Sequence, residues 1–434
     1  MKNKIVYIAL SVDVLHHGHI NLINHAKKYG KVTAGLLTDS AISIKKRLPL
    51  LNYSQRKKIL ENISGISKVI PQNEWEYSKN ILRIKPDYMI HGDDWIHGSD
   101  KDLRNSTIKA LKKIGGKLIE IPHTKNISSY SLKERMYADT LIPSNRQATL
   151  KRLLQAKGIT RFLEAHSPLS AIIAEQVFHR NKSGKKIEFD GFWSSSLTDS
   201  TLKGKPDIEV LELNQRLTNI NDIFDVTTKP LIIDIDTGGK IEHLEINLKT
   251  IERSGASAVI MEDKKGLKKN SLFGNKVKQE QENVKEFSKK ISSGKKATTG
   301  KLMIIARIES LILGKPVKDA ITRAKKYVEA GADGIMIHSK DKDPKEVFKF
   351  AEKFKREFNE IPLVAVPSSY NSVKENHLED AGFNIVIYAN QMLRASYPAM
   401  RQVALEILKN GRAYESEKNI MSIKDILELI PGTK

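Results

Sequence analysis

The sequence contains no cysteine among its 434 residues. This absence excludes disulfide bonds, thiolate metal sites and cysteine nucleophiles, and it is typical of a protein of the cytoplasm. The N-terminus lacks the pattern of a signal peptide, and no apolar run approaches the roughly 20 residues that a membrane-spanning helix needs. We therefore expect a cytoplasmic protein without a membrane partner.

Acidic side chains are scarce relative to basic ones. The chain has 51 Asp and Glu against 73 Lys and Arg, which gives a formal net charge of +22. The lysines are spread along the whole chain, and no basic cluster with interleaved aromatic residues is present, so we expect no nucleic-acid partner. A field of this sign favours small anionic ligands such as phosphates and nucleotides.

The first part of the chain, residues 1–138, alternates short apolar runs with helical patterns. Such alternation predicts an open, mainly parallel α/β sheet, whose ligands lie at the carboxyl ends of the strands. The expected strands are residues 4–10, 32–37, 68–70, 88–90 and 117–121.

His16 and His19 follow the first of these strands, at the expected start of a helix. Their spacing lets both rings share one face, and the helix N-terminus adds free N–H groups and a positive dipole end. Two imidazoles and these donors suit the stabilisation of charge on a nucleotide α-phosphate. The pattern His16-x-Gly18-His19 resembles that of the HxGH nucleotidyltransferases, in particular the glycerol-3-phosphate cytidylyltransferases.

Further residues fit this resemblance. Gly92-Asp93-Asp94-Trp95 is similar to a turn of that family, and Ile127-Ser128-Ser129 is similar to the end of its last motif. The resemblance implies a Rossmann-like nucleotidyltransferase domain that takes CTP or another nucleoside triphosphate. It implies as nucleotide-binding residues His16, His19, Lys45, Arg47, Arg56, Asp94, Ser128 and Ser129.

The last motif also departs from the family pattern. His123 and Lys125 stand in place of Arg and Glu, and Asn126 stands in place of Gly. These changes leave open which nucleotide binds and whether the domain is active. The alternative is a degenerate domain that is retained for assembly.

A polar stretch at residues 139–150 is expected to be a linker, because the sheet pattern stops there. The remaining residues, 151–434, have the length of a (β/α)8 barrel of the TIM type. Eight apolar runs are expected to form its strands: residues 170–173, 188–193, 230–236, 258–262, 303–307, 334–338, 363–367 and 384–388. The predicted fold class is therefore α/β, with a Rossmann-like domain followed by a TIM-type barrel.

Carboxylates end the third and fourth of these runs. Asp234 and Asp236 are two residues apart, so both face the same side of their strand, and Glu262 with Asp263 ends the next strand. Hard divalent cations take carboxylate oxygens. The sequence therefore predicts a Mg2+ site formed by Asp234, Asp236 and Glu262.

The loop after Glu262 carries a second resemblance. Glu262-Asp263-Lys264, followed after five residues by Asn270-Ser271, resembles the signature of the phosphoenolpyruvate mutases, in the isocitrate-lyase-like superfamily. The resemblance implies interconversion of phosphoenolpyruvate and phosphonopyruvate, with Asp234 as the direct Mg2+ ligand. The implied catalytic residues are Asp207, Lys268, Asn270, Arg307 and His338. The implied substrate-binding residues are Trp193, Ser195, Ser196, Leu197 and Ser271, of which Ser196 replaces a glycine of some members.

Two alternatives remain open for the second part. Phosphonopyruvate hydrolases share the barrel, although Lys268 and Asn270 favour a mutase, and a non-catalytic assembly protein is the alternative from another class. The isocitrate and methylisocitrate lyases use a cysteine, which this chain lacks. The resemblance also implies coupling to a downstream phosphonopyruvate decarboxylase and a homo-oligomer, a dimer or a tetramer.

Overall fold

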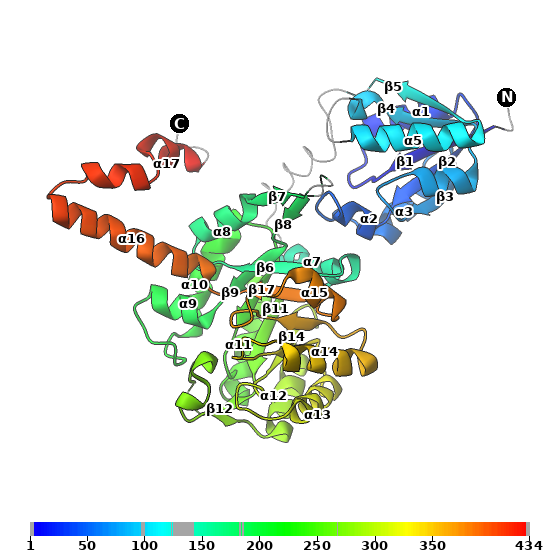
Figure 1. Ribbon diagram of the computed structural model, residues 1–434. Helices are drawn as coiled ribbons and strands as arrows, with labels where there is room; N and C mark the ends of the chain where they lie inside the picture. The colour runs from blue at the N-terminus through cyan, green and yellow to red at the C-terminus, as the bar shows by residue number, and fades with distance from the viewer. Residues whose placement is uncertain are drawn as a thin grey trace.

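The computed structural model describes residues 4–96, 100–122, 124, 143–181, 184, 186–266 and 268–430. Two parallel sheets organise them, an open sheet near the N-terminus and a closed barrel (Figure 1). In these residues no helix combines the length and the apolar character that crossing a membrane requires.

The open sheet has the strand order β3-β2-β1-β4-β5, and all its pairings are parallel, as predicted. Its strands are β1 Ile5–Leu10, β2 Lys31–Leu37, β3 Ile66–Gln72, β4 Tyr88–Gly92 and β5 Lys117–Ile121. Its helices are α1 His17–Ala26, α2 Asp39–Ser43, α3 Tyr53–Glu61, α4 Ser78–Ile84, η1 Asp93–Trp95 and α5 Lys101–Ile114.

Helices cover both faces of this sheet because the side chains of β1 alternate between two cores. Val6 and Ile8 pack in one hydrophobic cluster with residues of α1 and α3. Tyr7 and Ala9 pack in the other with residues of α4 and α5. The carboxyl ends of the strands thus remain as the place for a ligand.

The barrel is closed by eight parallel strands in the order β10-β11-β14-β15-β16-β17-β6-β9. They are β6 Thr160–Glu164, β9 Gly191–Ser194, β10 Leu231–Asp234, β11 Ala258–Glu262, β14 Met303–Ile308, β15 Gly334–Ile337, β16 Leu363–Ala365 and β17 Ile385–Tyr388. The helices around them are α7 Pro143–Ala156, α8 Pro168–Gln176, α9 Ser196–Leu202, α10 Leu213–Val226, α11 Ile241–Ser254, α12 Val284–Ala297, α13 Val317–Glu329, α14 Lys345–Glu357, α15 Glu375–Asp380, α16 Gln391–Asn410, η3 Tyr414–Asn419 and α17 Ile423–Leu429. Short hairpins and a turn complete the chain: β7 Phe178–Arg180 with β8 Lys186–Glu188, β12 Lys264–Lys265 with β13 Glu280–Gln281, and η2 Ser271–Lys276.

The prediction for the first barrel strand was wrong. Residues 170–173 lie in α8, and the strand is β6, which comes earlier in the chain. Ser167 caps α8 by accepting a hydrogen bond from the Ser170 amide, and Pro168 stands in its first turn, so the apolar run continues a helix. Charged Arg161 and Glu164 interrupt the apolar pattern of β6 and concealed it.

The segment expected to be a linker is largely helical. Helix α7 begins at Pro143, and its Leu150 is fully buried in the cluster that fills the barrel interior, together with Phe162 and Trp193. From the same helix, Arg152 donates hydrogen bonds to the Leu50 carbonyl (3.0 Å) and to Asp39 (3.2 Å) of the N-terminal domain. Helix α7 therefore packs under the barrel and also contacts the first domain.

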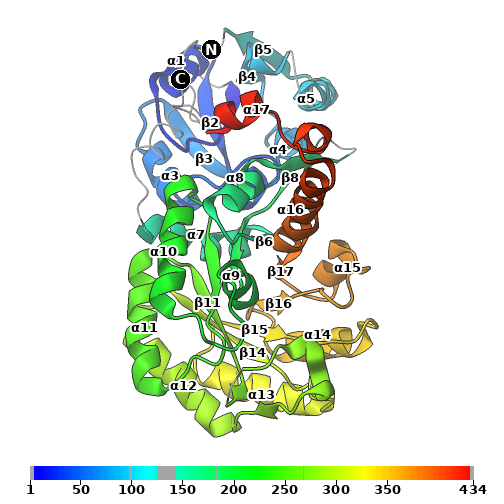
Figure 2. The ribbon, with the colours of Figure 1, turned by 90° about the vertical axis from the view of Figure 1, so that its left-hand side faces the viewer.

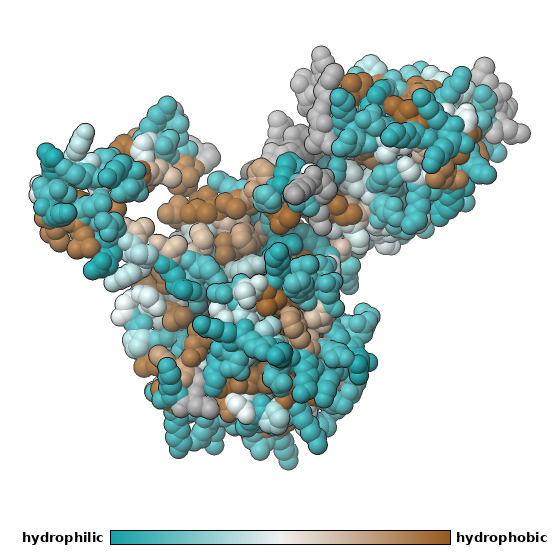
Figure 3. Space-filling view, viewed as in Figure 1, coloured by the Kyte–Doolittle hydropathy of each residue, from teal (hydrophilic) through white to brown (hydrophobic). Residues whose placement is uncertain are grey.

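Helix α16 forms an arm that extends away from the barrel (Figures 1 and 2). None of its residues is buried, and its exposed apolar side chains include Tyr397, Met400 and Leu408. Leu169 and Phe178 are exposed on the neighbouring surface of α8 and β7, and Figure 3 shows hydrophobic residues gathered there.

Candidate functional site

Polar side chains from neighbouring strands meet at the carboxyl end of the barrel. Asp234 ends β10, Glu262 ends β11, Arg307 lies near the end of β14 and His338 follows β15. These strands are adjacent in the closed sheet, so their ends converge on one mouth. All four side chains are buried.

Asp234 and Asp236 are held together at this mouth. Asp234 accepts a hydrogen bond from the Ser196 hydroxyl (2.7 Å) through one oxygen and from the Asp236 amide (3.1 Å) through the other. Asp236 has a φ of 53°, in the left-handed region that non-glycine residues rarely adopt. Burial and the charge of Asp234 raise the pKa of Asp236 to about 6.

Lys268 reaches this pair of aspartates from the loop that follows β12. Its ammonium donates hydrogen bonds to Ser196 Oγ (2.5 Å) and Asp207 Oδ1 (2.7 Å) and forms an ion pair with Asp236. The residue is only 5% exposed. Burial alone lowers the pKa of Lys268, but the neighbouring carboxylates outweigh burial and raise it above its ordinary value. Lys268 therefore stays charged.

Asn270 and Ser271 bring the same loop over the mouth. The Asn270 amide donates to Asp207 Oδ2 (3.1 Å). Ser271, 4% exposed, accepts from Arg307 and Lys264 (2.6 Å each) and donates to Glu309 (2.6 Å). The loop is therefore closed onto the barrel in this structure.

Arg307 and His338 form one network with Glu309. Arg307 Nε donates to Glu309 (2.6 Å), and its Nη2 donates to His338 Nδ1 (2.8 Å). A guanidinium has no acceptor, so Nδ1 of His338 accepts and its proton lies on Nε2. Burial and the charge of Arg307 lower the pKa of His338, so the ring is neutral at pH 7. The neutral ring is thus fixed as a donor through Nε2.

Glu309 is a buried member of the site that the sequence interpretation missed. It contacts Arg307, His338 (3.3 Å), Ser271 and Lys264 (3.3 Å). Burial raises the pKa of Glu309, but Arg307 and Lys264 outweigh it and hold the pKa well below its usual range. The spacing Arg307-x-Glu309 was the available signal, because residues two apart point to one side of a strand.

Arg216 of α10 is the second residue that was missed, and no local pattern marks it. It donates hydrogen bonds to Asp199 (2.9 Å), to Ser194 Oγ (3.1 Å) and to the Asp234 carbonyl. It thereby joins the end of β9 to the end of β10. Arg216 positions the backbone on which the predicted substrate-binding residues Ser195 and Ser196 lie.

The remaining predicted substrate-binding residues lie beside this junction. Trp193 is buried among the side chains of the barrel interior, and its Nε1 has no hydrogen-bond partner. Leu197 is half-buried in α9. The structure therefore gathers the predicted residues around one mouth.

Asp263 does not share this mouth with Glu262. It accepts hydrogen bonds from the Glu309 amide (2.9 Å) and the Tyr327 hydroxyl (2.8 Å), and it pairs with Arg323 (3.2 Å). The expectation that both carboxylates at the end of β11 suit a cation is therefore wrong for Asp263, which fastens α13 to the barrel.

Three carboxylates at the mouth, those of Asp234, Asp236 and Glu262, offer oxygen atoms to a cation. Oδ1 of Asp236 pairs with Lys268, and the two oxygens of Glu262 lie 3.2 Å from Arg307 and 3.6 Å from Lys264, while burial raises the pKa of Glu262 to about 7. In the described ranges no three acidic or imidazole side chains form a ready cage for a metal. Mg2+ commonly takes one or two carboxylates and completes its shell with water. This ion therefore fits a site in which Asp234 is the direct ligand and Asp236 and Glu262 lie further out.

A second candidate site lies at the end of β1 in the N-terminal domain. The rings of His16 and His19 have centroids 3.9 Å apart. Nδ1 of His16 accepts from the Gly18 amide (3.2 Å), and Nδ1 of His19 accepts from the His16 amide (3.3 Å). Both protons of the neutral rings therefore lie on Nε2, the atom that can donate to a phosphoryl oxygen. Burial and His16 lower the pKa of His19 to about 4.

The predicted triphosphate contacts have different environments. Arg56 is 0% exposed and donates to the carbonyls of Ser11 (2.5 Å) and Leu37 (2.9 Å) and to Asp39 (2.7 Å). In this structure its guanidinium therefore holds separate segments together, and its contact with a triphosphate stays a prediction.

The other predicted nucleotide contacts lie nearer the surface. Lys45 pairs with Asp100 (2.8 Å), and Arg47 pairs with Glu175 of the barrel domain. Asp94 has a side chain that is half exposed, in the turn η1. Ser128, Ser129 and the altered motif residues 123, 125 and 126 lie outside the described residues.

Comparisons with known proteins divide the chain in the same way. The sequence profile described as "Phosphoenolpyruvate phosphomutase" matches residues 150–408, and the profile described as "Cytidylyltransferase-like" matches residues 11–135. Phosphonopyruvate hydrolase of Variovorax sp. (strain Pal2) is 33% identical over 65% of this chain and 94% of its own length. Phosphoenolpyruvate phosphomutase of Tetrahymena pyriformis is 32% identical over 66% of this chain and 92% of its own.

Solved structures agree with these matches. The phosphoenolpyruvate phosphomutase of Streptomyces platensis subsp. rosaceus has a TM-score of 0.59 and 34% identity, and the alignment covers 65% of this chain and 94% of that one. A phosphonopyruvate hydrolase solved with oxalate and Mg2+ has a TM-score of 0.57 and 33% identity, with the same coverage. By its barrel and by a profile that spans more than half of its length, the chain belongs to the phosphoenolpyruvate phosphomutase family, with a cytidylyltransferase-like domain ahead of the barrel.

Proposed function

We propose that the barrel is a phosphoenolpyruvate mutase, which interconverts phosphoenolpyruvate and phosphonopyruvate for phosphonate biosynthesis. The observation that carries this proposal is the closed loop. Lys268 and Asn270 both donate to Asp207, while Ser271 of the same loop bonds Arg307 and Glu309. A mutase must keep a migrating phosphoryl group from water, and a loop fastened to both sides of the mouth suits that need.

The reaction moves one phosphoryl group within one molecule. Toward phosphoenolpyruvate, the bond between phosphorus and C3 breaks and a bond between phosphorus and the C2 oxygen forms, so no other reactant is consumed. A loose transition state of this kind depends on positioning and on stabilisation of charge. Arg307 supplies a fixed positive charge, and His338 and Asn270 supply donors for the phosphoryl oxygens.

Mg2+ would be held by Asp234, with Asp236 and Glu262 acting through water, and when bound it supplies charge stabilisation to the enolate. The assignment of Mg2+ is supported by the structure of a related phosphonopyruvate hydrolase, which contains Mg2+ and oxalate. Ser196 ties Asp234 to the segment expected to hold the substrate carboxylate. This tie fixes the position of that carboxylate relative to the ion site.

Phosphonopyruvate hydrolysis is the second candidate, because a hydrolase of this activity is as similar in sequence as the mutases are. Phosphorus NMR of the full chain with phosphonopyruvate and Mg2+ separates the two. Phosphoenolpyruvate is the expected product. Inorganic phosphate as the first and only product would show that the barrel is a hydrolase and not a mutase. An unchanged spectrum would contradict both activities.

For the N-terminal domain we propose nucleotidyl transfer, most simply from CTP. Its support is the cytidylyltransferase-like profile together with the paired rings of His16 and His19. An acceptor oxygen attacks the α-phosphorus, a new P–O bond forms, and pyrophosphate leaves. The two Nε2–H groups would stabilise charge on the α-phosphoryl oxygens. Pyrophosphate release is measured with CTP and ATP in parallel, and silence with both would contradict the proposal.

A further inference from the structure

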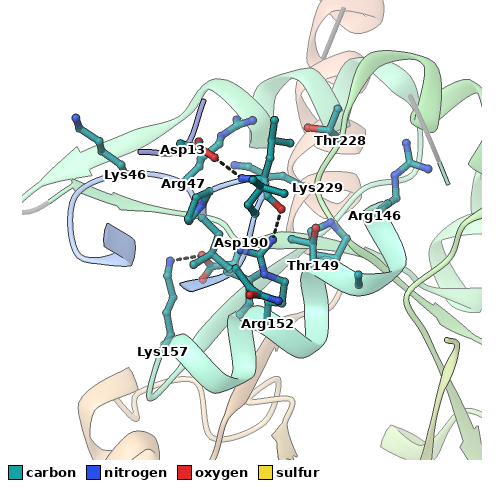
Figure 4. Close-up of a pocket in the computed structure, with 18 of the residues that line it drawn as sticks. Asp13, Lys46, Arg47, Arg146, Thr149, Arg152, Lys157, Asp190, Thr228 and Lys229 are labelled. Carbon is teal, nitrogen blue, oxygen red and sulfur yellow. Dashed lines mark hydrogen bonds and ion pairs between the residues drawn. The ribbon is translucent and has the colours of Figure 1, made fainter. Parts of the chain in front are cut away.

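A cavity of about 800 Å3 lies between the two domains (Figure 4). From the N-terminal domain it is lined by residues 13–15 and by the loop of residues 46–52. From the other side it is lined by α7 and by the residues that precede β9 and β10. Its volume lies within the range of small-molecule sites. Neither domain encloses this space alone.

Among the charged residues that line the cavity, the basic ones outnumber the acidic ones. Three of its residues are acidic, namely Asp13, Glu188 and Asp190. Six are basic, namely Lys46, Arg47, Arg146, Arg152, Lys157 and Lys229. Four of the six come from α7 and the barrel domain. The excess of positive charge predicts an anionic occupant.

Arg152 lines this cavity with part of its side chain exposed, at 21%. Its two terminal nitrogens bond the Leu50 carbonyl and Asp39, but its Nε is buried and has no hydrogen-bond partner. Nε itself is shielded, so an anion in the cavity would meet the exposed part of the guanidinium, beside its pair with Asp39. Arg152 of α7 thus bonds residues of the N-terminal domain that lie at the other side of the cavity.

Lys229 places a second cation at the cavity, directly before β10. It is 7% exposed, donates to the Phe189 carbonyl (2.7 Å) and stands 3.7 Å from Glu188. Burial lowers the pKa of Lys229, because the nearby carboxylates offset only part of the hydration that its ammonium loses. An anion bound beside it would supply the missing compensation.

The cavity adjoins the nucleotide site without including it. Asp13 and Leu15 line it, and the next residue, His16, begins the histidine pair. Asp13 also accepts a hydrogen bond from the Leu50 amide (2.5 Å), which fastens the loop of residues 46–52 to the end of β1. His16 and His19 are not among the lining residues. A ligand in the cavity would therefore lie beside the segment that leads into His16.

We propose that this interdomain cavity binds the acceptor of nucleotidyl transfer, a small organic phosphonate or phosphate monoester, with Lys229 and Arg152 of the barrel domain holding its anionic group. The inference rests on the proposed nucleotidyl transfer. An oxygen of the bound anion, already deprotonated at neutral pH, forms a bond to the α-phosphorus of the nucleotide. The bond from the α-phosphorus to the bridging oxygen breaks, and pyrophosphate leaves.

The first test measures pyrophosphate release by the full chain with CTP and either 2-aminoethylphosphonate, 2-hydroxyethylphosphonate or glycerol 3-phosphate as the probe. Lys229→Met and Arg152→Gln are each expected to raise the KM for the acceptor about 10- to 100-fold, as loss of a charge-assisted hydrogen bond does. The KM for CTP and the mutase rate should stay within about twofold. Lys229→Arg should restore acceptor binding in part. Lys249→Met, on an exposed position of α11, is the matched control.

The second test is calorimetric binding of the same phosphonates to the wild type, Lys229→Met and Arg152→Gln without nucleotide. Binding that these substitutions abolish supports the cavity even if no transfer occurs, so the failure of the two proposals is distinguishable. Transfer with an unchanged acceptor KM in both variants would overturn the inference and leave nucleotidyl transfer standing. Absence of both transfer and phosphonate binding in the wild type would overturn it as well.

Discussion

Lys268 forms a buried ion pair with Asp236 while it donates a hydrogen bond to Asp207. One ammonium from a loop thus connects a strand end of the barrel to the segment after α9. The carboxylates that a cation would use are, in this closed form, already neutralised by a side chain. A metal ion that enters beside Asp236 must therefore compete with Lys268, so metal affinity and loop position are expected to be coupled.

Removal of the negative charge from Asp234 should abolish mutase turnover. Asp234→Asn keeps the shape of the side chain but can replace only one of the two hydrogen bonds that Asp234 accepts, from Ser196 or from the Asp236 amide. We expect a modest loss of Tm, and the anchor proposed for Mg2+ is lost. We expect kcat to fall about 100-fold or more. Phosphorus NMR measures the rate of conversion. Asp225→Asn, at a position of α10 outside the mouth, is the control. Near-native activity of Asp234→Asn at low Mg2+ would refute the metal assignment.

Asn270→Ala should impair catalysis far more than stability. The side chain contacts Asp207 and caps η2 from a surface loop, so little packing is lost. We expect a fall in kcat of about 10- to 100-fold and a nearly unchanged Tm. Leu272→Ala on the same loop, where the side chain is exposed, should leave the rate nearly unchanged. A large loss of Tm in Asn270→Ala would instead mark Asn270 as structural.

Glu309→Gln should destabilise the barrel because it leaves Arg307 buried without its closest carboxylate partner. Breaking a buried pair in this way costs about 3 to 5 kcal/mol. Calorimetry of the thermal transitions measures the shift. In contrast, Glu329→Gln removes the exposed pair with Lys326 and should cost less than about 1 kcal/mol. Equal shifts for the two variants would show that the network around Glu309 does not stabilise the fold.

His19 should make the stability of the N-terminal domain depend on pH. Its pKa is about 4 in the folded chain against 6.5 for the free side chain, because it is buried beside His16. Between these values the unfolded chain binds a proton that the folded chain does not, so the free energy of unfolding falls as the pH is lowered through this window. Thermal unfolding from about pH 7 to about pH 4.5 should show a weaker pH dependence in His19→Gln than in the wild type. Parallel curves would contradict the assignment.

The residues that could be predicted from the sequence are those whose pattern is local. Apolar runs with small flanking residues located seven of the eight barrel strands. The spacing Asp234-x-Asp236 brought two carboxylates to one strand end, but Asp236 lies beyond β10 with a φ of 53°, so the strand geometry expected for the pair was wrong. The first barrel strand was missed because charged residues interrupt it. Arg216 could not be found, since its contacts with Asp199 and Ser194 depend on how α10 packs against β9 and β10.

The structural role of Arg56 also could not be predicted from the sequence. A family motif marked it as a ligand contact, but its guanidinium is surrounded by backbone carbonyls of three separate segments. Whether an arginine faces a ligand or the interior is decided by tertiary packing, which a motif does not contain.

The two sites open at opposite ends of the barrel, since the mouth with Asp234 lies where the strands end and the interdomain cavity adjoins Lys229, where β10 begins. If both proposed activities hold, a product released at the mouth would have to pass the length of the barrel to reach this cavity. Such an arrangement suits a pathway in which the carbon skeleton is remodelled between the first step and the last.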